Sequence, residues 1–253
     1  MDWNNKKVGI IGAGIEGISS AMYFKKHSGE VTVLDKKSES ELEQKDIKLL
    51  RDEDIKVITG KNYLDNLSDF DFLVRSPGVK KEIIESKLSC GERSGFARDK
   101  TIITSQTQLF FDLCPCPIIG VTGTKGKGTT SALIYEMLKK QGKDAYLGGN
   151  IGKPQFNFLD TLNPQSKVVL ELSSFQLQDT TKSPHIAVVL MITSDHLDYH
   201  GDVHDYIDAK RNILRFQTKN DFAIINRDYP AANESDMHTD GKVFFVSRER
   251  PII

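Results

Sequence analysis

Two runs of β-branched residues pass straight into glycine-rich segments, and this arrangement limits the chain to a small group of folds. The first run, residues 8–11, is followed by Gly12-Ala-Gly14-Ile-Glu-Gly17, and the second, residues 118–122, by Gly123-Thr-Lys-Gly-Lys-Gly-Thr-Thr130. A helical pattern follows each segment. Strand, glycine turn and helix in this order are typical of parallel α/β sheets, in which glycines let the backbone turn tightly and approach a phosphate.

The rest of the chain continues this alternation of short apolar runs and amphipathic stretches. Further strands are expected at 31–34, 55–58, 72–74, 101–104, 168–172, 186–192, 222–225 and 243–246, and helices up to about residue 27 and at 41–51, 80–88, 106–113, 129–140 and 204–216. The prolines of Cys114-Pro-Cys-Pro117 block helix continuation. We therefore expect an α/β protein with a Rossmann-like domain over residues 1–113 and a P-loop-type ATPase domain over residues 114–253.

Charge balance and cysteine content narrow the class of protein further. Lys and Arg number 34 against 35 Asp and Glu, so the chain lacks the basic excess of most proteins that bind nucleic acids or membrane surfaces. Three cysteines favour a reducing compartment, and Cys114-Pro-Cys116 has no second pair that would complete a zinc site. No apolar run is long enough for a signal peptide or a membrane span. We expect a cytoplasmic protein that binds neither nucleic acid nor membrane.

The first glycine segment has the spacing G-x-G-x-x-G, and Asp35 ends the next expected strand. Backbone N–H groups and the dipole at the start of the helix attract a phosphate, and Asp35 would accept hydrogen bonds from a ribose or a base. Most such segments bind NAD or FAD. The same glycines also suit close packing of the helix on the strand without any ligand, so this segment alone leaves both interpretations open.

The second glycine segment resembles a P-loop, although Val121 occupies the position of the first glycine and Gly128 that of the Ser or Thr after the lysine. Its chemistry still suits a nucleoside triphosphate. Backbone N–H groups wrap the phosphate oxygens, Lys127 neutralises the β- and γ-phosphates, and the Thr129 hydroxyl is a ligand for Mg²⁺. The residues expected to bind ATP are Gly123, Thr124, Lys125, Gly126, Lys127, Gly128, Thr129 and Thr130.

This segment and four that follow it resemble the Mur ligase superfamily. The four are Gly148-Gly-Asn-Ile-Gly152, Leu170-Glu-Leu-Ser-Ser-Phe-Gln-Leu177, Thr193-Ser-Asp-His-Leu-Asp198 and Tyr206-Ile-Asp-Ala-Lys210. Residues 170–177 are the most specific, and Ser76-Pro-Gly78 in the first domain also matches. The similarity covers essentially the whole chain and is greatest to the branch that joins D-glutamate to UDP-N-acetylmuramoyl-L-alanine in peptidoglycan synthesis.

The resemblance implies an ATP-driven amide ligation. The substrate carboxylate attacks the γ-phosphate to give an acyl phosphate, and an amine then displaces phosphate, so positioning and charge neutralisation dominate the catalysis. The first glycine segment then becomes a site for UDP. The residues implied to contact the UDP-sugar substrate are Gly14, Ile15, Glu16, Asp35, Lys36, Ser76, Gly78, Asn150, Ser173 and Gln176. Those implied to support Mg²⁺ are Thr129, Glu171, His196 and Lys210, and those implied in catalysis are Lys127, His196 and Lys210.

Three of these residues also have simpler interpretations. Glu171 would be a solvated carboxylate at the end of a strand, and His196 an exposed turn residue between two aspartates. Lys210 matches a lysine that the family carbamylates, but a lysine on a helix is usually solvated. Its assignment therefore rests wholly on the resemblance.

The family has three domains, whereas this chain would reach only into the second. We therefore expect a truncated product, or one half of a split ligase whose partner is a separately encoded C-terminal domain. One alternative is a non-catalytic fragment that binds UDP-sugar or ATP. Another, based on the first glycine segment alone, is an NAD-dependent oxidoreductase.

Overall fold

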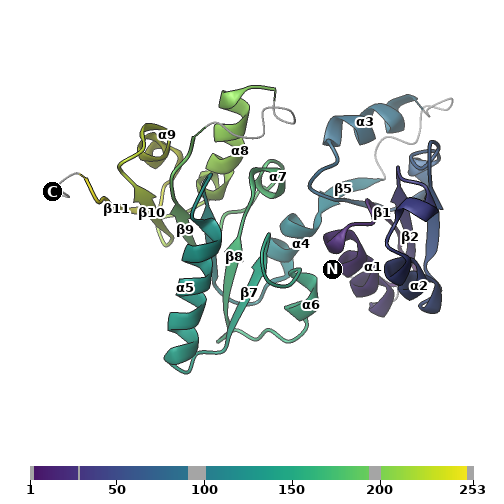
Figure 1. The fold of residues 1–253 in the computed structure, drawn as a ribbon, viewed down its shortest axis with the longest axis horizontal. Coiled ribbons are helices and arrows are strands. Elements are labelled where there is room, and N and C mark those ends of the chain that lie inside the picture. Colours follow the sequence, from purple (N-terminus) through teal and green to yellow (C-terminus); the bar gives the residue numbers. More distant parts are fainter. Residues whose placement is uncertain (1–2, 28, 91–100, 194–200, 250–253) are drawn as a thin grey trace. The chain divides into compact units, whose positions relative to one another are not determined.

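The computed structural model describes residues 3–27, 29–90, 101–193 and 201–249. Contacts between residues divide the chain into two compact units, Met1–Gln106 and Thr107–Ile253. Each unit is built on its own parallel β-sheet, which confirms the predicted α/β class (Figure 1). The expected boundary after residue 113 lies at the end of helix α4 (Gln106–Leu113), most of which belongs to the second unit.

The first unit has a five-stranded sheet in the order β3-β2-β1-β4-β5, with every neighbouring pair parallel. Its strands are β1 (Lys7–Ile11), β2 (Glu30–Asp35), β3 (Lys56–Thr59), β4 (Phe72–Arg75) and β5 (Ile102–Ser105). Its helices are α1 (Ile15–Lys26), α2 (Gln44–Asp52) and α3 (Lys81–Cys90), with short 3₁₀ turns at Glu39–Glu41 and Leu67–Asp69.

The core of the first unit forms where the apolar strands meet the segments that follow them. Ile11, Leu34 and Leu73 come from three adjacent strands and pack with Leu64, Leu67 and Ile84. Trp3 is the single tryptophan of the chain, and its buried ring meets the rings of Phe24 and Phe72 edge-on at centroid distances of 4.9 and 5.0 Å. Its fluorescence therefore reports on the first unit.

The second unit has a six-stranded sheet in the order β11-β10-β9-β6-β8-β7, again with every neighbouring pair parallel. Its strands are β6 (Ile118–Thr122), β7 (Ala145–Gly149), β8 (Lys167–Glu171), β9 (Ile186–Val189), β10 (Phe222–Asn226) and β11 (Lys242–Val246). Its helices are α5 (Lys127–Lys140), α6 (Phe156–Leu159), α7 (Ser174–Leu177), α8 (Val203–Arg215) and α9 (Pro230–Asn233), followed by a 3₁₀ turn at Glu234–His238. Helix α5 packs on β6, β7 and β8, and α8 packs on α7 (Figure 1).

The sequence prediction omits the four-residue helices α6, α7 and α9, and two further differences have identifiable reasons. The sequence predicts no strand at β7, because Ala145-Tyr-Leu-Gly-Gly149 lacks β-branched residues; the segment forms an edge strand by pairing with β8. Helix α5 begins at Lys127 rather than Thr129. Gly126 at φ +86° makes the left-handed turn directly before it, so the helix starts as soon as the loop ends.

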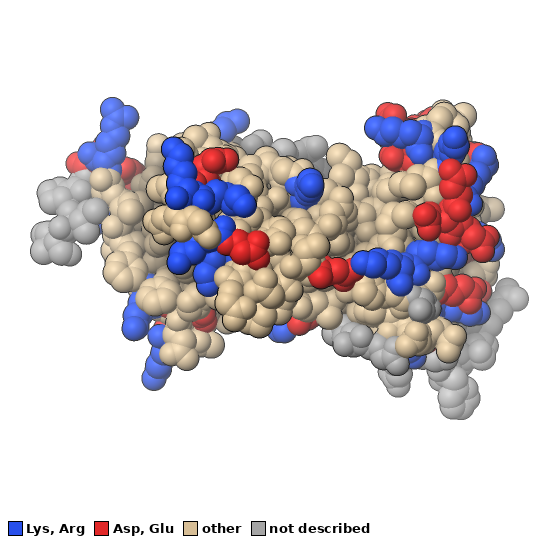
Figure 2. Space-filling model, turned by 90° about the horizontal axis from the view of Figure 1, so that it is seen from below, with Lys and Arg blue, Asp and Glu red and all other residues tan. Residues whose placement is uncertain are grey.

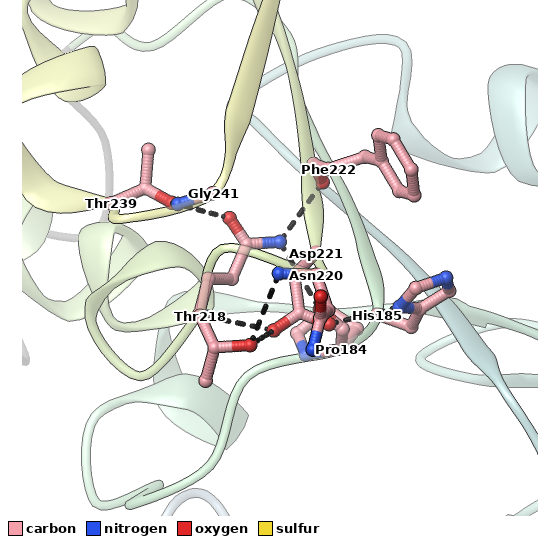
Figure 3. Close-up of polar contacts among 9 residues, drawn as sticks. Pro184, His185, Thr218, Asn220, Asp221, Phe222, Thr239 and Gly241 are labelled. Atoms are coloured by element: carbon pink, nitrogen blue, oxygen red, sulfur yellow. Dashed lines mark hydrogen bonds and ion pairs between the residues drawn. The ribbon is translucent and has the colours of Figure 1, made fainter.

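Polar contacts tie together the amino ends of β9, β10 and β11, at the edge of the sheet away from the glycine segment (Figure 3). Buried Gln217 donates to the carbonyls of Pro184 and Phe222 and accepts from the Thr239 hydroxyl. His185 Nδ1 lies 2.9 Å from Asp221 Oδ1. Partial burial alone would raise the pKa of Asp221, but hydrogen bonds from Thr218 and His185 hold it below the ordinary value. These contacts hold together the loops that precede β9, β10 and β11.

Candidate functional site

Both glycine segments lie where the strand order of their sheet reverses. In the first unit β1 lies between β2 and β4, and in the second β6 lies between β8 and β9. The chain leaves the carboxyl end of each of these central strands through its glycine segment. Ligands of open parallel α/β sheets bind at such reversal points, outside the carboxyl ends of the strands. The topology therefore gives each unit one candidate binding site.

Two glycines give the second segment its shape. Gly123 has φ +152°, and a Cβ there would lie 2.9 Å from the Cβ of Leu190, so a side chain would be both strained and crowded. Gly126 has φ +86° and precedes α5 without a side-chain cap in the described part of the segment. The first N–H groups of a helix have no partner within the helix itself. The start of the 14-residue helix α5 therefore offers uncapped donors to an anion.

Two lysines converge on one carbonyl of this segment. Lys127 Nζ donates to the carbonyl oxygens of Gly123 and Thr124 at 3.0 and 3.2 Å. Lys210 Nζ, from α8, donates to the same Gly123 oxygen at 3.0 Å and lies 4.6 Å from the centre of the Tyr206 ring. Lys210 is only 2% exposed, so the interpretation of a solvated helix lysine is wrong. Two positive charges thus lie at the turn where triphosphate binding is predicted.

The predicted nucleotide-binding residues divide by exposure. Thr124 is buried, and its hydroxyl contacts the Thr193 carbonyl at 3.0 Å and the Tyr206 hydroxyl at 3.1 Å, so it fastens the segment to α8. Gly123 is also buried. The others are exposed or half-buried and remain open to a ligand: Lys125, Gly126, Lys127, Gly128, Thr129 and Thr130.

Glu171 ends β8 beside this segment and is 4% exposed, which excludes the interpretation of a solvated carboxylate. Its Oε1 accepts a hydrogen bond from Asn150 Nδ2 at 2.9 Å. Its Oε2 is buried and has no hydrogen-bond partner among the residues that the structure describes. A Cβ added at Gly128 would lie 3.2 Å from this Oε2. A buried carboxylate oxygen left unsatisfied is costly, and a divalent cation would satisfy it.

Ser173 and Gln176 form a capping box at the start of α7. The Gln176 N–H donates to Ser173 Oγ at 3.2 Å, and the Ser173 N–H donates to Gln176 Oε1 at 2.9 Å. Gln176 is buried, whereas Ser173 is half-buried. These bonds give both residues a local structural role, and their contact with a substrate stays a prediction.

In the first segment, two glycines are required by close packing and one is not. A Cβ at Gly17 would lie 1.8 Å from the Gly12 carbonyl oxygen, and one at Gly12, where φ is +101°, would lie 2.5 Å from Ser76 Oγ. At Gly14, no described atom outside its chain neighbours lies within 4 Å of the Cβ position. The packing interpretation therefore explains Gly12 and Gly17, and Gly14 faces open space at the start of α1.

Asp35 is the last residue of β2, and its carboxylate holds the first glycine segment in place by hydrogen bonding. Its Oδ2 accepts from the Ala13 N–H at 2.7 Å and its Oδ1 from the Lys37 N–H at 2.8 Å. Lys36 and Ile15 are exposed, Glu16 is half-buried, and Tyr63 lies near the carboxylate. Burial, together with the charge of Asp35, raises the pKa of Tyr63 above its ordinary value.

Arg75 is a residue of this site that the sequence prediction missed. It ends β4, is 1% exposed, and donates through Nη1 to the carbonyls of Ser76, Pro77 and Val79, the last at 2.9 Å. Ser76 Oγ in turn donates to the Gly12 carbonyl at 3.3 Å. Arg75 therefore shapes the Ser76-Pro-Gly78 turn against the first segment. In the sequence, the signal that could have identified Arg75 is its position at the end of an apolar strand.

His196 lies outside the described residues, as do its neighbours in 194–200. In the part of the chain that the structure describes, no three His, Cys, Asp or Glu side chains form a cluster suited to a metal ion. The thiols of Cys114 and Cys116 lie 3.6 Å apart, and burial, with the neighbouring Cys114, raises the pKa of Cys116 to about 12. Both are therefore thiols at neutral pH.

The surface and the helices carry two further observations. On the face drawn in Figure 2, Lys and Arg side chains lie intermingled with Asp and Glu side chains rather than in a stripe of one sign. No helix among the described residues is long and apolar enough to cross a membrane.

Comparison with protein families gives two matches. The Mur ligase middle domain matches residues 121–251, and the N-terminal domain of MurD-like Mur ligases matches residues 6–90. The UDP-N-acetylmuramoylalanine–D-glutamate ligase of Acetivibrio thermocellus is 40% identical over 97% of this chain and 51% of its own length. The enzyme of the same name from Clostridium kluyveri is 37% identical over 94% of this chain and 50% of its own. The chain thus spans about half the length of these curated relatives.

Solved structures show the same fold at lower identity. The UDP-N-acetylmuramate:L-alanyl-gamma-D-glutamyl-meso-diaminopimelate ligase from Neisseria meningitides aligns with a TM-score of 0.64 at 20% identity, over 95% of this chain and 78% of that one. A murein peptide ligase from Psychrobacter arcticus aligns with a TM-score of 0.60 at 16% identity, over 95% of this chain and 53% of that one.

Proposed function

This chain belongs to the Mur ligase family, and from that membership we propose that it forms the substrate- and ATP-binding part of a ligase that adds D-glutamate to UDP-N-acetylmuramoyl-L-alanine. ATP binds the second unit at Gly123–Thr130, and the UDP group binds the first unit near Gly14, Ile15, Glu16, Asp35, Lys36, Ser76 and Gly78. The reaction belongs to peptidoglycan synthesis, in the cytoplasm where ATP is supplied. The observation that carries the proposal is the buried Glu171 Oε2, which has no hydrogen-bond partner among the described residues and lies beside an uncapped helix start.

Mg²⁺ fits the oxygen ligands present at this site. Glu171 Oε2 and the exposed Thr129 hydroxyl would hold it, because Mg²⁺ prefers carboxylate and hydroxyl oxygens and keeps bound water and phosphate as further ligands. His196 and Lys210 would support a second ion, with Lys210 carbamylated. When bound, Mg²⁺ supplies neutralisation of the charge that develops on the transferred phosphoryl group.

The chain's own residues bind and orient the reactants. Lys127 leaves the carbonyls of Gly123 and Thr124 and pairs with the β- and γ-phosphates, because a charged acceptor binds its ammonium group more strongly than a neutral carbonyl does. The N–H groups at the start of α5 bind phosphate oxygens. Asn150 directly follows β7, and Ser173 and Gln176 lie at the start of α7 after β8, where the reacting end of the UDP-sugar would meet the γ-phosphate.

The experiment that tests this proposal follows product formation. The chain is mixed with ATP, Mg²⁺, UDP-N-acetylmuramoyl-L-alanine and D-glutamate, alone and with the C-terminal half of the Acetivibrio thermocellus relative supplied separately. We expect phosphate release and the ligated product in the second mixture, both lost in Lys127→Ala. Binding of both nucleotides without product would favour the non-catalytic fragment. Binding of NADH without UDP-sugar would favour the oxidoreductase and contradict the proposal.

A further inference from the structure

Asn150 and Glu171 are joined by two hydrogen bonds, one between backbones and one between side chains. The Asn150 N–H donates to the Glu171 carbonyl at 2.9 Å, and Asn150 Nδ2 donates to Glu171 Oε1 at 2.9 Å. The carboxylate is therefore held at one oxygen only. Its Oε2 is buried and has no hydrogen-bond partner in the described part of the chain.

The glycines before Asn150 make this close approach possible. Gly149 has φ +95°, and a Cβ there would lie 2.1 Å from the Glu171 carbonyl oxygen, so β7 reaches β8 this closely only with glycine at its last position. A Cβ at Gly148 would lie 2.7 Å from both the Lys153 carbonyl and the Phe158 ring. The glycines of Gly148-Gly-Asn150 thus let the backbone come close enough to place the Asn150 side-chain amide on Glu171.

The amide also decides which way the carboxylate faces. The last torsion of a glutamate side chain has broad minima, so a free carboxylate turns easily. Only Nδ2 of the asparagine amide donates, and it fixes Oε1 on the β7 side. Oε2 then faces Gly128. A Cβ at position 128 would lie 3.2 Å from Oε2, and glycine leaves this space open. The free oxygen is presented to the first turn of α5.

We propose that Asn150 is a positioning residue that orients Glu171 for a divalent cation bound with the nucleotide. This inference rests on the proposed ATP and Mg²⁺ site. A hydrogen-bond donor behind a metal-binding carboxylate fixes its orientation, and losing such a donor typically weakens metal binding about 10- to 100-fold. The role is separate from the predicted contact of Asn150 with substrate, because it acts in the absence of UDP-sugar.

The test measures the binding of Mn²⁺ to the whole chain by electron paramagnetic resonance. Mn²⁺ is a paramagnetic substitute for Mg²⁺. Titrations use saturating adenylyl imidodiphosphate and no UDP-sugar. Asn150→Leu keeps approximately the side-chain shape but removes the donor without adding a charge, and Asn150→Ala removes the side chain. The matched control is Asn163→Ala, since Asn163 is also exposed and its Nδ2 donates to the Asp144 carboxylate at 3.3 Å, away from the glycine segment. Nucleotide affinity in EDTA is measured for every variant.

We expect both Asn150 variants to weaken Mn²⁺ binding at least 10-fold, with metal-free nucleotide affinity within about 2-fold of the parent chain. Asn163→Ala should leave both affinities unchanged. Mn²⁺ affinity that is unaltered in Asn150→Leu, or lowered equally in Asn163→Ala, would overturn the inference and leave the proposed function standing. A parent chain that binds neither nucleotide nor Mn²⁺ would overturn both.

Discussion

The two glycine segments occupy equivalent places in their sheets, yet the acidic side chain beside each is used differently. Asp35 has a backbone N–H on each of its oxygens. Glu171 has an amide on one oxygen and no described partner on the other. A carboxylate occupied by backbone donors holds a loop in shape, whereas a buried carboxylate with a free oxygen is prepared for a cation. The same strand–glycine–helix arrangement thus fits the proposed UDP site in one unit and the proposed Mg²⁺–ATP site in the other.

The two glycine segments also differ in the lysines that lie at them. The second segment carries Lys127 within its turn and receives buried Lys210 from α8, and both donate to the Gly123 carbonyl. The first segment has no lysine between Gly12 and Gly17. A triphosphate with its transferred group needs charge neutralisation, which Lys127 would supply directly and carbamylated Lys210 through a metal ion, whereas a diphosphate that is only bound is held by backbone N–H groups.

The largest expected effect separates packing glycines from ligand glycines in the first segment. Gly17→Ala forces a Cβ against the Gly12 carbonyl and should cost about 3 kcal/mol of unfolding free energy. Gly14→Ala meets open space and should cost no more than about 1 kcal/mol, as alanine at a helix N-cap does. Urea unfolding followed by Trp3 fluorescence measures both. Gly14→Ala should still weaken UDP binding, and equal stability of the two variants would contradict the packing described.

Removing Lys127 from the second segment should act on ATP alone. Lys127→Ala loses a charge-assisted contact worth about 2–3 kcal/mol, so the affinity for a fluorescent ATP analogue should fall about 30- to 150-fold. Lys139→Ala, in the exposed last turn of α5, is the control and should change nothing. UDP affinity should stay the same in both variants. A matching loss of UDP affinity would mean that the two segments are not separate sites.

Replacing Asp35 or Glu171 by the corresponding amide should change the free energy of unfolding in opposite directions. Asp35→Asn places an amide against a backbone N–H and should lower the unfolding free energy by about 1–2 kcal/mol, read from Trp3. Glu171→Gln removes a buried charge with a free oxygen and should raise it by about 1 kcal/mol without metal, read by circular dichroism. Destabilisation by both would show that Glu171 is as fully paired as Asp35.

The smallest expected effect concerns Tyr63. Its pKa is raised by burial and by Asp35, so its share of stability is present below the unfolded pKa of about 10 and is lost as pH rises through the folded pKa. Asp35→Asn should move the Tyr63 pKa back toward its ordinary value. The phenolate absorbance of the parent chain minus that of Tyr63→Phe measures this. Asp65→Asn, at an exposed position, should leave the Tyr63 pKa where it is.

The sequence predicted the sheets, both glycine segments and the acidic residues because these features follow from local pattern and strand order. It missed β7, whose glycines hide a strand that only pairing with β8 creates. It left Lys210 open, although Tyr206, Ala209, Lys210 and Ile213 share one helix face and all four are buried. The contact of Asn150 with Glu171 joins segments that are distant in the chain, and no spacing reveals it. The capping box of Ser173 with Gln176 and the bonds of Arg75 are local contacts, and the sequence prediction did not identify them.

Calorimetric titration of the chain with UDP and with Mg²⁺–adenylyl imidodiphosphate, each before and after saturation with the other, tests the central claim most directly. The account predicts one site for each nucleotide, with neither displacing the other. Lys127→Ala should weaken only the second binding event, and Gly14→Ala should weaken only the first. Competition of the two nucleotides for a single site, or displacement of UDP by NADH, would contradict the account.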